Sequence, residues 1–294
     1  MNAPIEIPNN IILKSIYPRT ISLLSPNYIN DIIEGIMDYI LTTDKVYHKN
    51  IEIESKLGQF NFISEKAKVF SYINETFKIP DNKSNQFQYK FISGISPSNF
   101  YSIWNAIERE CNIRNSGIRR IEPIVIKDTF YENGIRVSKF YKGGDLIKEE
   151  TIKKENRIDF NVRNYGNDFR ITCSKEIDTM CDNENSSINK RDKFRISYLF
   201  SYFEIDLTIS KSNDINERYN YEVEIEIKNL VDLLKGQNWE FNLRTILMRF
   251  MQNIINLYTA ILPDSINLID NQERNFKNCY GDYLQNQVKK NINK

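Results

Sequence analysis

Two segments far apart in the chain carry glutamates at every second position. Glu52 and Glu54 alternate with isoleucine in IEIESKLG, and YNYEVEIEIKN contains Glu222, Glu224 and Glu226. Side chains two residues apart on a strand share one face and lie roughly 7 Å apart. At an effective dielectric near 20, each such pair repels by about 2 kcal/mol, so these faces need compensating cations. All-oxygen ligands without Cys or His suit Mg²⁺ or Mn²⁺.

Composition restricts what other chemistry the chain could perform. Among its 294 residues there is one histidine, His48, so His-rich metal sites are excluded and a Ser-His-Asp triad could use only that residue. The four cysteines lack CxxC spacing, which is typical of free thiols. The nucleotide-binding patterns GxxxxGK[ST] and GxGxxG do not occur. If the protein is an enzyme, its carboxylates, lysines and arginines must carry the chemistry.

Charge and hydropathy indicate the class of protein. Lys and Arg number 40 against 39 Asp and Glu, a formal net charge of +1. Bulk attraction to nucleic acid would need a strong basic excess, so any phosphate binding must come from local clusters. The first residues lack the pattern of a signal peptide, and no apolar run reaches membrane-spanning length. We therefore expect a soluble, intracellular protein that does not contact membranes.

The elements that must position the charged residues are mostly strands. Residues 121–177 and 193–228 form apolar and polar alternations, with Asn133-Gly134 and Gly143-Gly144 as hairpin signals and a polar loop at 178–190. With segments 51–57 and 87–93 this gives about eight to ten strands. Short connections without an internal repeat favour a closed barrel or a two-sheet sandwich. Helices are expected at residues 25–43, 96–110 and 242–262.

The strands share an apolar face opposite a face with charges of both signs. FRITCSKEI places Arg170 and Glu176 on the polar face of its strand, and KFRIS does the same for Lys193 and Arg195. EIDLTIS places Asp206 on the polar face as well. Taken strand by strand, such a face is usually solvated. The helices, however, need an apolar surface to pack on. If they cover the outside of a barrel, the charges point into a polar lumen.

Three motifs together resemble those of a known family. IEIESKLG, RISYLFSYFEIDLT and YEVEIEI resemble, in this order, the signature motifs of the metal-dependent RNA 5′-triphosphatases. This is the beta-subunit type of mRNA-capping enzyme in the triphosphate tunnel metalloenzyme superfamily, and the resemblance spans about residues 50–229. It implies a mainly β (α+β) fold, a closed antiparallel eight-stranded β-barrel tunnel with a polar interior, supported by flanking helices. The expected domain is 1–264, with 1–49 as an N-terminal helical arm, followed by a polar tail at 265–294.

The resemblance also implies a role for individual residues. The metal ligands would be Glu52, Glu54 and Glu226. Phosphate oxygens would be bound by Arg136, Lys193 and Arg195, with looser matches at Lys153 (or Lys154), Arg157 and Arg170. Glu176 would orient the attacking water, supported by Asp206, Glu222 and Glu224 together with Arg136, Lys193 and Arg195. The implied reaction is removal of the γ-phosphate from the triphosphate 5′ end of nascent mRNA, with Mg²⁺ or Mn²⁺ as cofactor.

Partners and location follow from the same resemblance. It implies 5′-triphosphate RNA as substrate and an mRNA guanylyltransferase as partner, and it allows a homodimer. The Trp-rich peptide by which some fungal members dock is lacking, so the helix at 242–262 is another candidate surface. The expected location is the nucleus, or the host cytoplasm or virion for a viral protein. Two alternatives stay open: a same-fold tripolyphosphatase or nucleoside triphosphatase without a capping role, and a non-catalytic anion-binding barrel.

Overall fold

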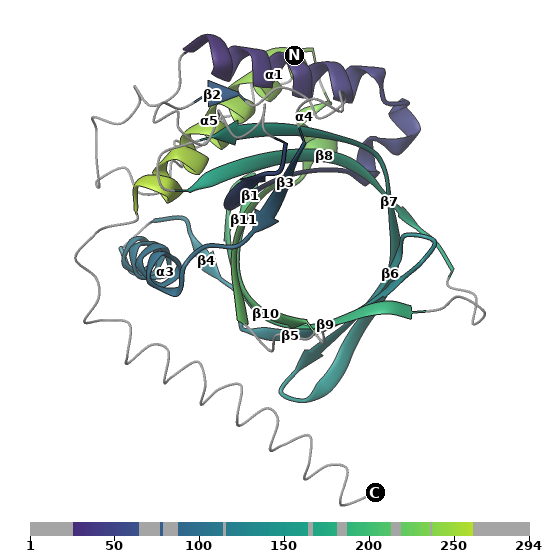
Figure 1. The fold of residues 1–294 in the computed structure, drawn as a ribbon. Coiled ribbons are helices and arrows are strands. Elements are labelled where there is room, and N and C mark those ends of the chain that lie inside the picture. The colour runs from purple at the N-terminus through teal and green to yellow at the C-terminus, as the bar shows by residue number, and fades with distance from the viewer. Residues whose placement is uncertain are drawn as a thin grey trace, which may run out of the picture.

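The chain forms a closed antiparallel β-barrel (Figure 1). The computed structural model describes residues 26–64, 77–78, 88–113, 116–163, 167–180, 187–212, 219–235 and 237–260. The barrel strands are β1 (Ile51–Phe62), β5 (Ile124–Tyr131), β6 (Ile135–Lys142), β7 (Asp145–Arg163), β8 (Asp168–Asp178), β9 (Ser187–Phe200), β10 (Phe203–Ser212) and β11 (Tyr219–Ile227). Around the ring their order is β10-β11-β1-β8-β7-β6-β5-β9, and pairing of β9 with β10 closes it. The predicted eight-stranded barrel is confirmed, and the sandwich is excluded.

Three short strands add to the barrel. β2 (Phe77–Lys78) pairs with β7, β3 (Tyr89–Ser93) with β1, and β4 (Arg119–Arg120) with β9. The described residues thus contain more strands than the sequence predicted, because strands as short as β2 and β4 show no alternation of their own. β9 also begins inside the predicted polar loop, where Asn189 and Lys190 pair with β5.

Helices cover part of the barrel's outer surface. They are α1 (Pro26–Thr42), the 3₁₀ helix η2 (Lys45–Asn50), α3 (Pro97–Cys111), α4 (Leu230–Leu233) and α5 (Trp239–Thr259). In Figure 1, α1 and α5 lie together on one side of the barrel and α3 lies beside β4. The Ser96 hydroxyl caps α3 by accepting a hydrogen bond from the Asn99 N–H at 3.2 Å. The three predicted helices are confirmed.

The hydrophobic core lies between these helices and the outward faces of the strands. Its helical part comes from the apolar stripes of α1, α3 and α5, and its sheet part from alternate residues of β1, β8, β9, β10 and β11. Phe203 of β10 and Phe250 of α5, for example, stack with ring centroids 6.3 Å apart. Because the apolar faces point outward to the helices, the charged faces point into the barrel, as the strand parity predicted.

Two glycine-containing turns close the β5–β6 and β6–β7 hairpins. Gly134 (φ 78°) joins β5 to β6, while Gly143 (φ 56°) and Gly144 (φ 95°) join β6 to β7. All three lie in the left-handed region that favours glycine. Both predicted hairpins are confirmed.

Some sequence predictions fall outside the described residues. These include the first part of the N-terminal arm, the tail at 265–294, Cys181 and Cys279. Cys111 and Cys173 are free thiols. Among the helices in the described ranges, none combines the length and apolar character that crossing a membrane would take. The domain boundaries stay a prediction.

A glycine brings α1 close to the barrel. A Cβ atom built on Gly35 would lie 2.5 Å from Cε1 of the Phe160 ring on β7. Because that ring is itself buried in the core, it has little room to move aside.

We therefore expect Gly35→Ala to destabilise the protein by roughly 1–3 kcal/mol through overpacking. Helix propensity alone would predict a gain of about 1 kcal/mol. The denaturation midpoint of the variant gives the sign. The same substitution in a Phe160→Leu background serves as control and should lose most of its cost, whereas stabilisation by Gly35→Ala alone would contradict the packing argument.

Candidate active site

The lumen of the barrel is lined by charged side chains from neighbouring strands. In the β1–β11 pairing, Glu54 lies opposite Glu226 and Lys56 opposite Glu224. Directly opposed residues share one face, so these four side chains point into the barrel together. β10 continues the surface, since its Asp206 lies opposite Glu224. The glutamate-rich strands therefore adjoin each other, as their matching alternation suggested.

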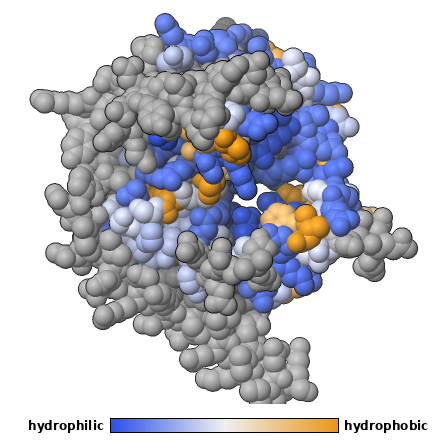
Figure 2. Space-filling view, viewed as in Figure 1, coloured by the Kyte–Doolittle hydropathy of each residue, from blue (hydrophilic) through white to orange (hydrophobic). Residues whose placement is uncertain are grey.

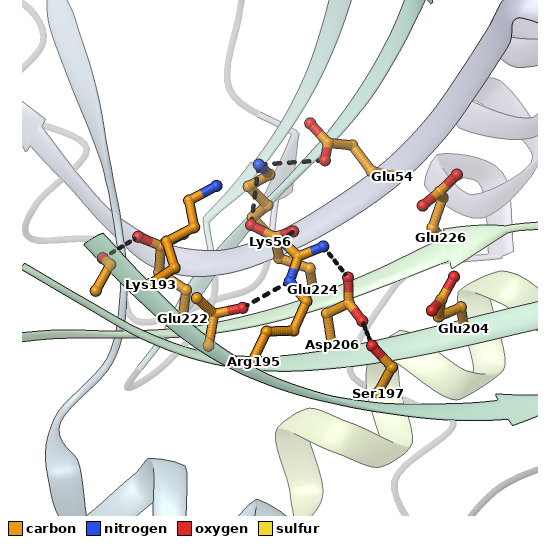
Figure 3. A network of polar contacts seen from close by, with 12 residues as sticks. Glu54, Lys56, Lys193, Arg195, Ser197, Glu204, Asp206, Glu222, Glu224 and Glu226 are labelled. Carbon is orange, nitrogen blue, oxygen red and sulfur yellow. Dashed lines mark hydrogen bonds and ion pairs between the residues drawn. The ribbon is translucent and has the colours of Figure 1, made fainter. Parts of the chain in front are cut away.

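Ion pairs form an alternating chain along this wall (Figure 3). The Lys56 ammonium lies 3.1 Å from Glu54 Oε2 and 3.0 Å from Glu224 Oε1. The Arg195 guanidinium lies 3.5 Å from Glu224 Oε2 and 2.6 Å from Asp206 Oδ2. Burial opposes ionisation, but Lys56 and Arg195 outweigh it and hold the pKa of Glu224 well below its usual range. Lys56 and Lys154 likewise lower the pKa of Glu54, so Glu54 and Glu224 are ionised counter-charges of buried cations, whereas burial raises the pKa of Asp206 despite its contact with Arg195.

Compensation is weaker at the end of the wall where Glu226 and Glu52 lie. Lys228 contacts Glu226 at 2.8 Å, yet burial and the nearby Glu52 carboxylate raise the pKa of Glu226 to about 8. Burial and the adjacent Glu54 also raise the pKa of Glu52, although Lys154 contacts it. A raised pKa means that the ionised acids lack sufficient positive charge around them.

This end of the wall fits a divalent cation. The donor set of Glu52, Glu54 and Glu226 is all oxygen, which suits a hard cation, and a bound dication would supply the missing positive charge. In the described ranges, no cluster of three or more His, Cys, Asp or Glu side chains already has the arrangement to hold a metal ion. Each of the three carboxylates instead contacts a lysine.

A cluster of cations from β6 and β9 surrounds Asp128 of β5. Asp128 accepts contacts from Lys193 at 2.6 Å and Arg191 at 3.2 Å, and Arg136 lies near enough to act on its charge. Burial would raise the pKa of Asp128, but Lys193 leads the cations that lower it to about 2. Burial and then Arg191 lower the pKa of Lys193 to about 8, although Asp128 pairs with it; Arg191 itself also contacts Glu222 at 3.5 Å.

Two groups of this cluster also lack hydrogen-bond partners among the described residues. The buried Nε atoms of Arg136 and Arg191 donate no hydrogen bond there. Unpaired buried donors are costly, and Arg guanidinium groups match phosphate oxygens in geometry. The cluster of Arg136, Arg191 and Lys193 is therefore suited to bind an anion such as a phosphate group.

Glu176 of β8 links the two charged regions. Its Oε1 atom lies 3.7 Å from Arg136 Nη2 and 3.5 Å from Lys154 Nζ, and Lys154 also contacts Glu52 and Glu54. The same buried Oε1 takes part in no hydrogen bond among the described residues. A carboxylate oxygen in this position could accept a hydrogen bond from a water molecule.

These residues surround one cavity of about 240 Å³. In the described residues, nine carboxylates and seven cationic side chains line it, a formal excess of two negative charges. Figure 2 shows hydrophilic residues gathered around the opening of the barrel, with a few apolar ones among them. Of the predicted site residues, the cavity brings together Glu52, Glu54, Arg136, Glu176, Lys193, Arg195, Asp206, Glu224 and Glu226.

Four predicted residues do not line this cavity. Lys153 lies opposite Ile177, whereas Lys154 lies opposite Glu176 and points inward. Arg157 lies within the β-bulge between Glu155 and Ile158 and contacts Asp159 at 2.8 Å. Arg170 packs 4.6 Å over the Phe91 ring. Glu222 accepts hydrogen bonds from Ser210 (2.9 Å) and Asn220 (2.8 Å) and lies 3.5 Å from the cavity residue Arg191.

The cavity also contains residues that the sequence analysis did not assign. They are Lys56, Asp128, Glu150, Arg191, Glu204 and Lys228, together with Lys154, which was named only as an alternative to Lys153. Lys56, Arg191, Glu204 and Lys228 each lie two residues from an assigned residue, so parity alone could have found them. Asp128 gave no such signal, because its inward neighbour on β5 is Ile126.

Comparison with known proteins identifies the family. The family model of the mRNA capping enzyme, beta chain, matches residues 26–261. The chain belongs to this family. Among solved structures, the S. pombe Pct1 RNA triphosphatase has a TM-score of 0.62 at 23% identity, over 80% of this chain and 93% of that chain. Its complex with the Spt5 CTD gives 0.62 at 22% over the same shares. At these identities the likeness shows the fold. No curated protein sequence matches the chain.

Membership defines the activity. The chain is an RNA triphosphatase, a hydrolase that removes the 5′ γ-phosphate of mRNA as the first step of cap formation, and the family is divalent-metal dependent. The family's chemistry therefore accounts for both charged regions of the cavity in general terms: a region for a cation and a region for phosphates.

The pKa of Lys193 generates a testable prediction. In the free protein its ammonium is charged below pH 8 and loses its proton above it. Affinity for tripolyphosphate, at fixed Mg²⁺, should fall by roughly tenfold as the pH rises from about 7.5 to 9.5, the size of one charged contact.

The matched control is Lys193→Arg, whose guanidinium stays charged over this range. Calorimetric titration should show a flatter pH profile for this variant. Other groups, such as Glu226, titrate in both proteins, so the difference between the two profiles reports Lys193. Parallel profiles would contradict its contact with phosphate.

Proposed function

We propose that γ-phosphate hydrolysis is divided between the two charged regions of the barrel, with Glu176 between them. The observation that supports this division is the opposite imbalance of charge within one cavity. Burial and the neighbouring Glu52 carboxylate raise the pKa of Glu226 to about 8, whereas burial and the neighbouring Arg191 guanidinium lower the pKa of Lys193 to about 8. A divalent cation and a triphosphate together supply both missing charges.

Glu52, Glu54 and Glu226 would hold the metal, which we propose to be Mg²⁺ or Mn²⁺ from the oxygen donor set. When bound, the ion would neutralise and polarise the γ-phosphate. The lysines that contact these carboxylates, Lys56, Lys154 and Lys228, would keep them oriented. Because each also competes for the carboxylates, metal binding must rearrange some of these ion pairs.

Arg136, Arg191 and Lys193 would bind nonbridging phosphate oxygens and stabilise the charge that develops there. Arg195 lies on β9 with Arg191 and Lys193 but is already paired with Asp206 and Glu224. Its first role would be to hold these two carboxylates in place. Glu176 would orient the attacking water and accept its proton.

The proposed substrate is the 5′-triphosphate end of RNA, and the diphosphate product would pass to an mRNA guanylyltransferase. We keep that partner, a homodimer and a nuclear location (or host cytoplasm or virion) as proposals. The S. pombe Pct1 RNA triphosphatase forms a complex with the Spt5 CTD, which supports testing this peptide segment as a further ligand of this chain.

We expect Glu54→Gln and Glu226→Gln each to lower γ-phosphate release from triphosphate-ended RNA by roughly 100-fold or more, because each removes a metal ligand. Glu149→Gln, on an exposed glutamate of β7 paired with Lys139, is the matched control. Release of labelled phosphate is the readout, and thermal midpoints verify folding. Full activity in either ligand variant would rule out the assigned metal site.

Chelation should abolish release by the unmodified protein, and titration with Mg²⁺ or Mn²⁺ should restore it. The same assay with tripolyphosphate separates the alternative functions. Turnover of tripolyphosphate without turnover of RNA would contradict the capping role, and turnover of neither would support a barrel that only binds anions.

A further inference from the structure

The cavity wall contains an apolar patch that phosphate chemistry does not need. Among the described residues that line the cavity, Ile126 and Phe140 are the apolar ones, and all others except Ser138 are charged. Phe140 lines the cavity and is half-buried, so part of its side chain stays accessible. An aromatic side chain at this position buries less apolar surface than it would in the core, and it offers the neighbouring charges no ion-pair partner.

Strand register places the patch beside the cation cluster. Ile126 of β5 lies opposite Lys193 of β9 on one side and Phe140 of β6 on the other. Phe140 in turn lies opposite Lys148 of β7, whose ammonium is 5.6 Å from the ring centroid. Lys193, Ile126, Phe140 and Lys148 therefore form one row across four strands, a patch with a cation at each end.

The patch has a defined position relative to the chemistry. Arg136, which contacts Glu176, lies on β6 four residues before Phe140 and on the same face. Four residues of a strand span about 13 Å. A triphosphate whose γ-phosphate lies near Arg136 and Glu176 can therefore extend along β6 past Ser138, with its α-phosphate end toward Phe140.

We propose that Phe140, with Ile126 beside it, binds the first nucleoside of the RNA, packing against its base or ribose, and so determines preference for polynucleotide over inorganic triphosphate. This rests on the proposed binding of the phosphates by Arg136, Arg191 and Lys193. An aromatic face stacks with any base, which suits an enzyme that acts on every transcript. Tripolyphosphate has no group that could use the patch.

The test compares two substrates in one buffer with Mg²⁺: a short triphosphate-ended RNA and tripolyphosphate. The measured quantity is the kcat/KM for the RNA divided by the kcat/KM for tripolyphosphate. In Phe140→Ala this ratio should fall about tenfold, mainly through a higher KM for RNA, the size expected from one lost stacking contact. Phe140→Tyr keeps the ring and should retain the ratio of the unmodified protein. Ile147→Ala, which removes an exposed apolar side chain from the same β6–β7 hairpin, is the control and should also retain it.

A purely structural role for Phe140 would lower both activities together and leave the ratio unchanged, which would overturn the inference while leaving the triphosphatase function intact. A ratio that falls equally in Phe140→Tyr would overturn it as well, since the ring is present there. If the unmodified protein hydrolysed tripolyphosphate and not RNA, the capping function itself would fail and the inference with it, a result visible before any variant is made.

Discussion

Burial of charge inside a closed barrel is the constraint on which the rest of the structure depends. An ionised side chain taken out of water must be paired, or it loses its charge. Here Lys56, Arg195 and their carboxylate partners form a continuous chain across β1, β11, β10 and β9. Such a chain requires the strands to keep their register, because a shift by one residue would turn every charge outward. The ion pairs therefore add specificity of register rather than much net stability.

The outer surface follows from the same constraint. Since the polar faces of the strands line the lumen, hydrophobic stabilisation must come from their apolar faces, which have to be covered. α1, α3 and α5 provide that cover. The aromatic pair Phe203 and Phe250 illustrates the link. Phe203 lies on β10, the strand that carries Asp206, next to the inward Glu204, and its ring packs on Phe250 of α5. Packing outside the barrel thus holds the geometry inside it.

Strand parity made much of this site predictable from the sequence. Glu52, Glu54, Lys193, Arg195 and Asp206 lie in clear alternations, and closure of the barrel brings them into one cavity. Parity fails where the ladder is irregular or the pattern breaks. The β-bulge between Glu155 and Ile158, with Asn156 at φ 49°, breaks the alternation of β7 just after Lys153 and Lys154. Only the pairing of β7 with β8 shows that Lys154 faces inward. Asp128 needed the tertiary pairing between β5 and β9, which no local pattern contains.

The three glutamates of β11 show how neighbours divide one motif into different roles. Glu222 is held by Ser210, Asn220 and Arg191, and Glu224 by Lys56 and Arg195, whereas Lys228 is the one contact of Glu226 among the described residues. Glu224 is buried and Glu226 is partly exposed, so burial alone does not explain why the pKa of Glu226 is the raised one, and the charges around the two carboxylates matter as well. Glu224, with two cations, has a lowered pKa and serves as a structural counter-charge, while Glu226, with one lysine and the repulsion of Glu52, has a raised pKa. The carboxylate that the protein leaves least compensated is the one best placed to gain from a cation supplied from outside.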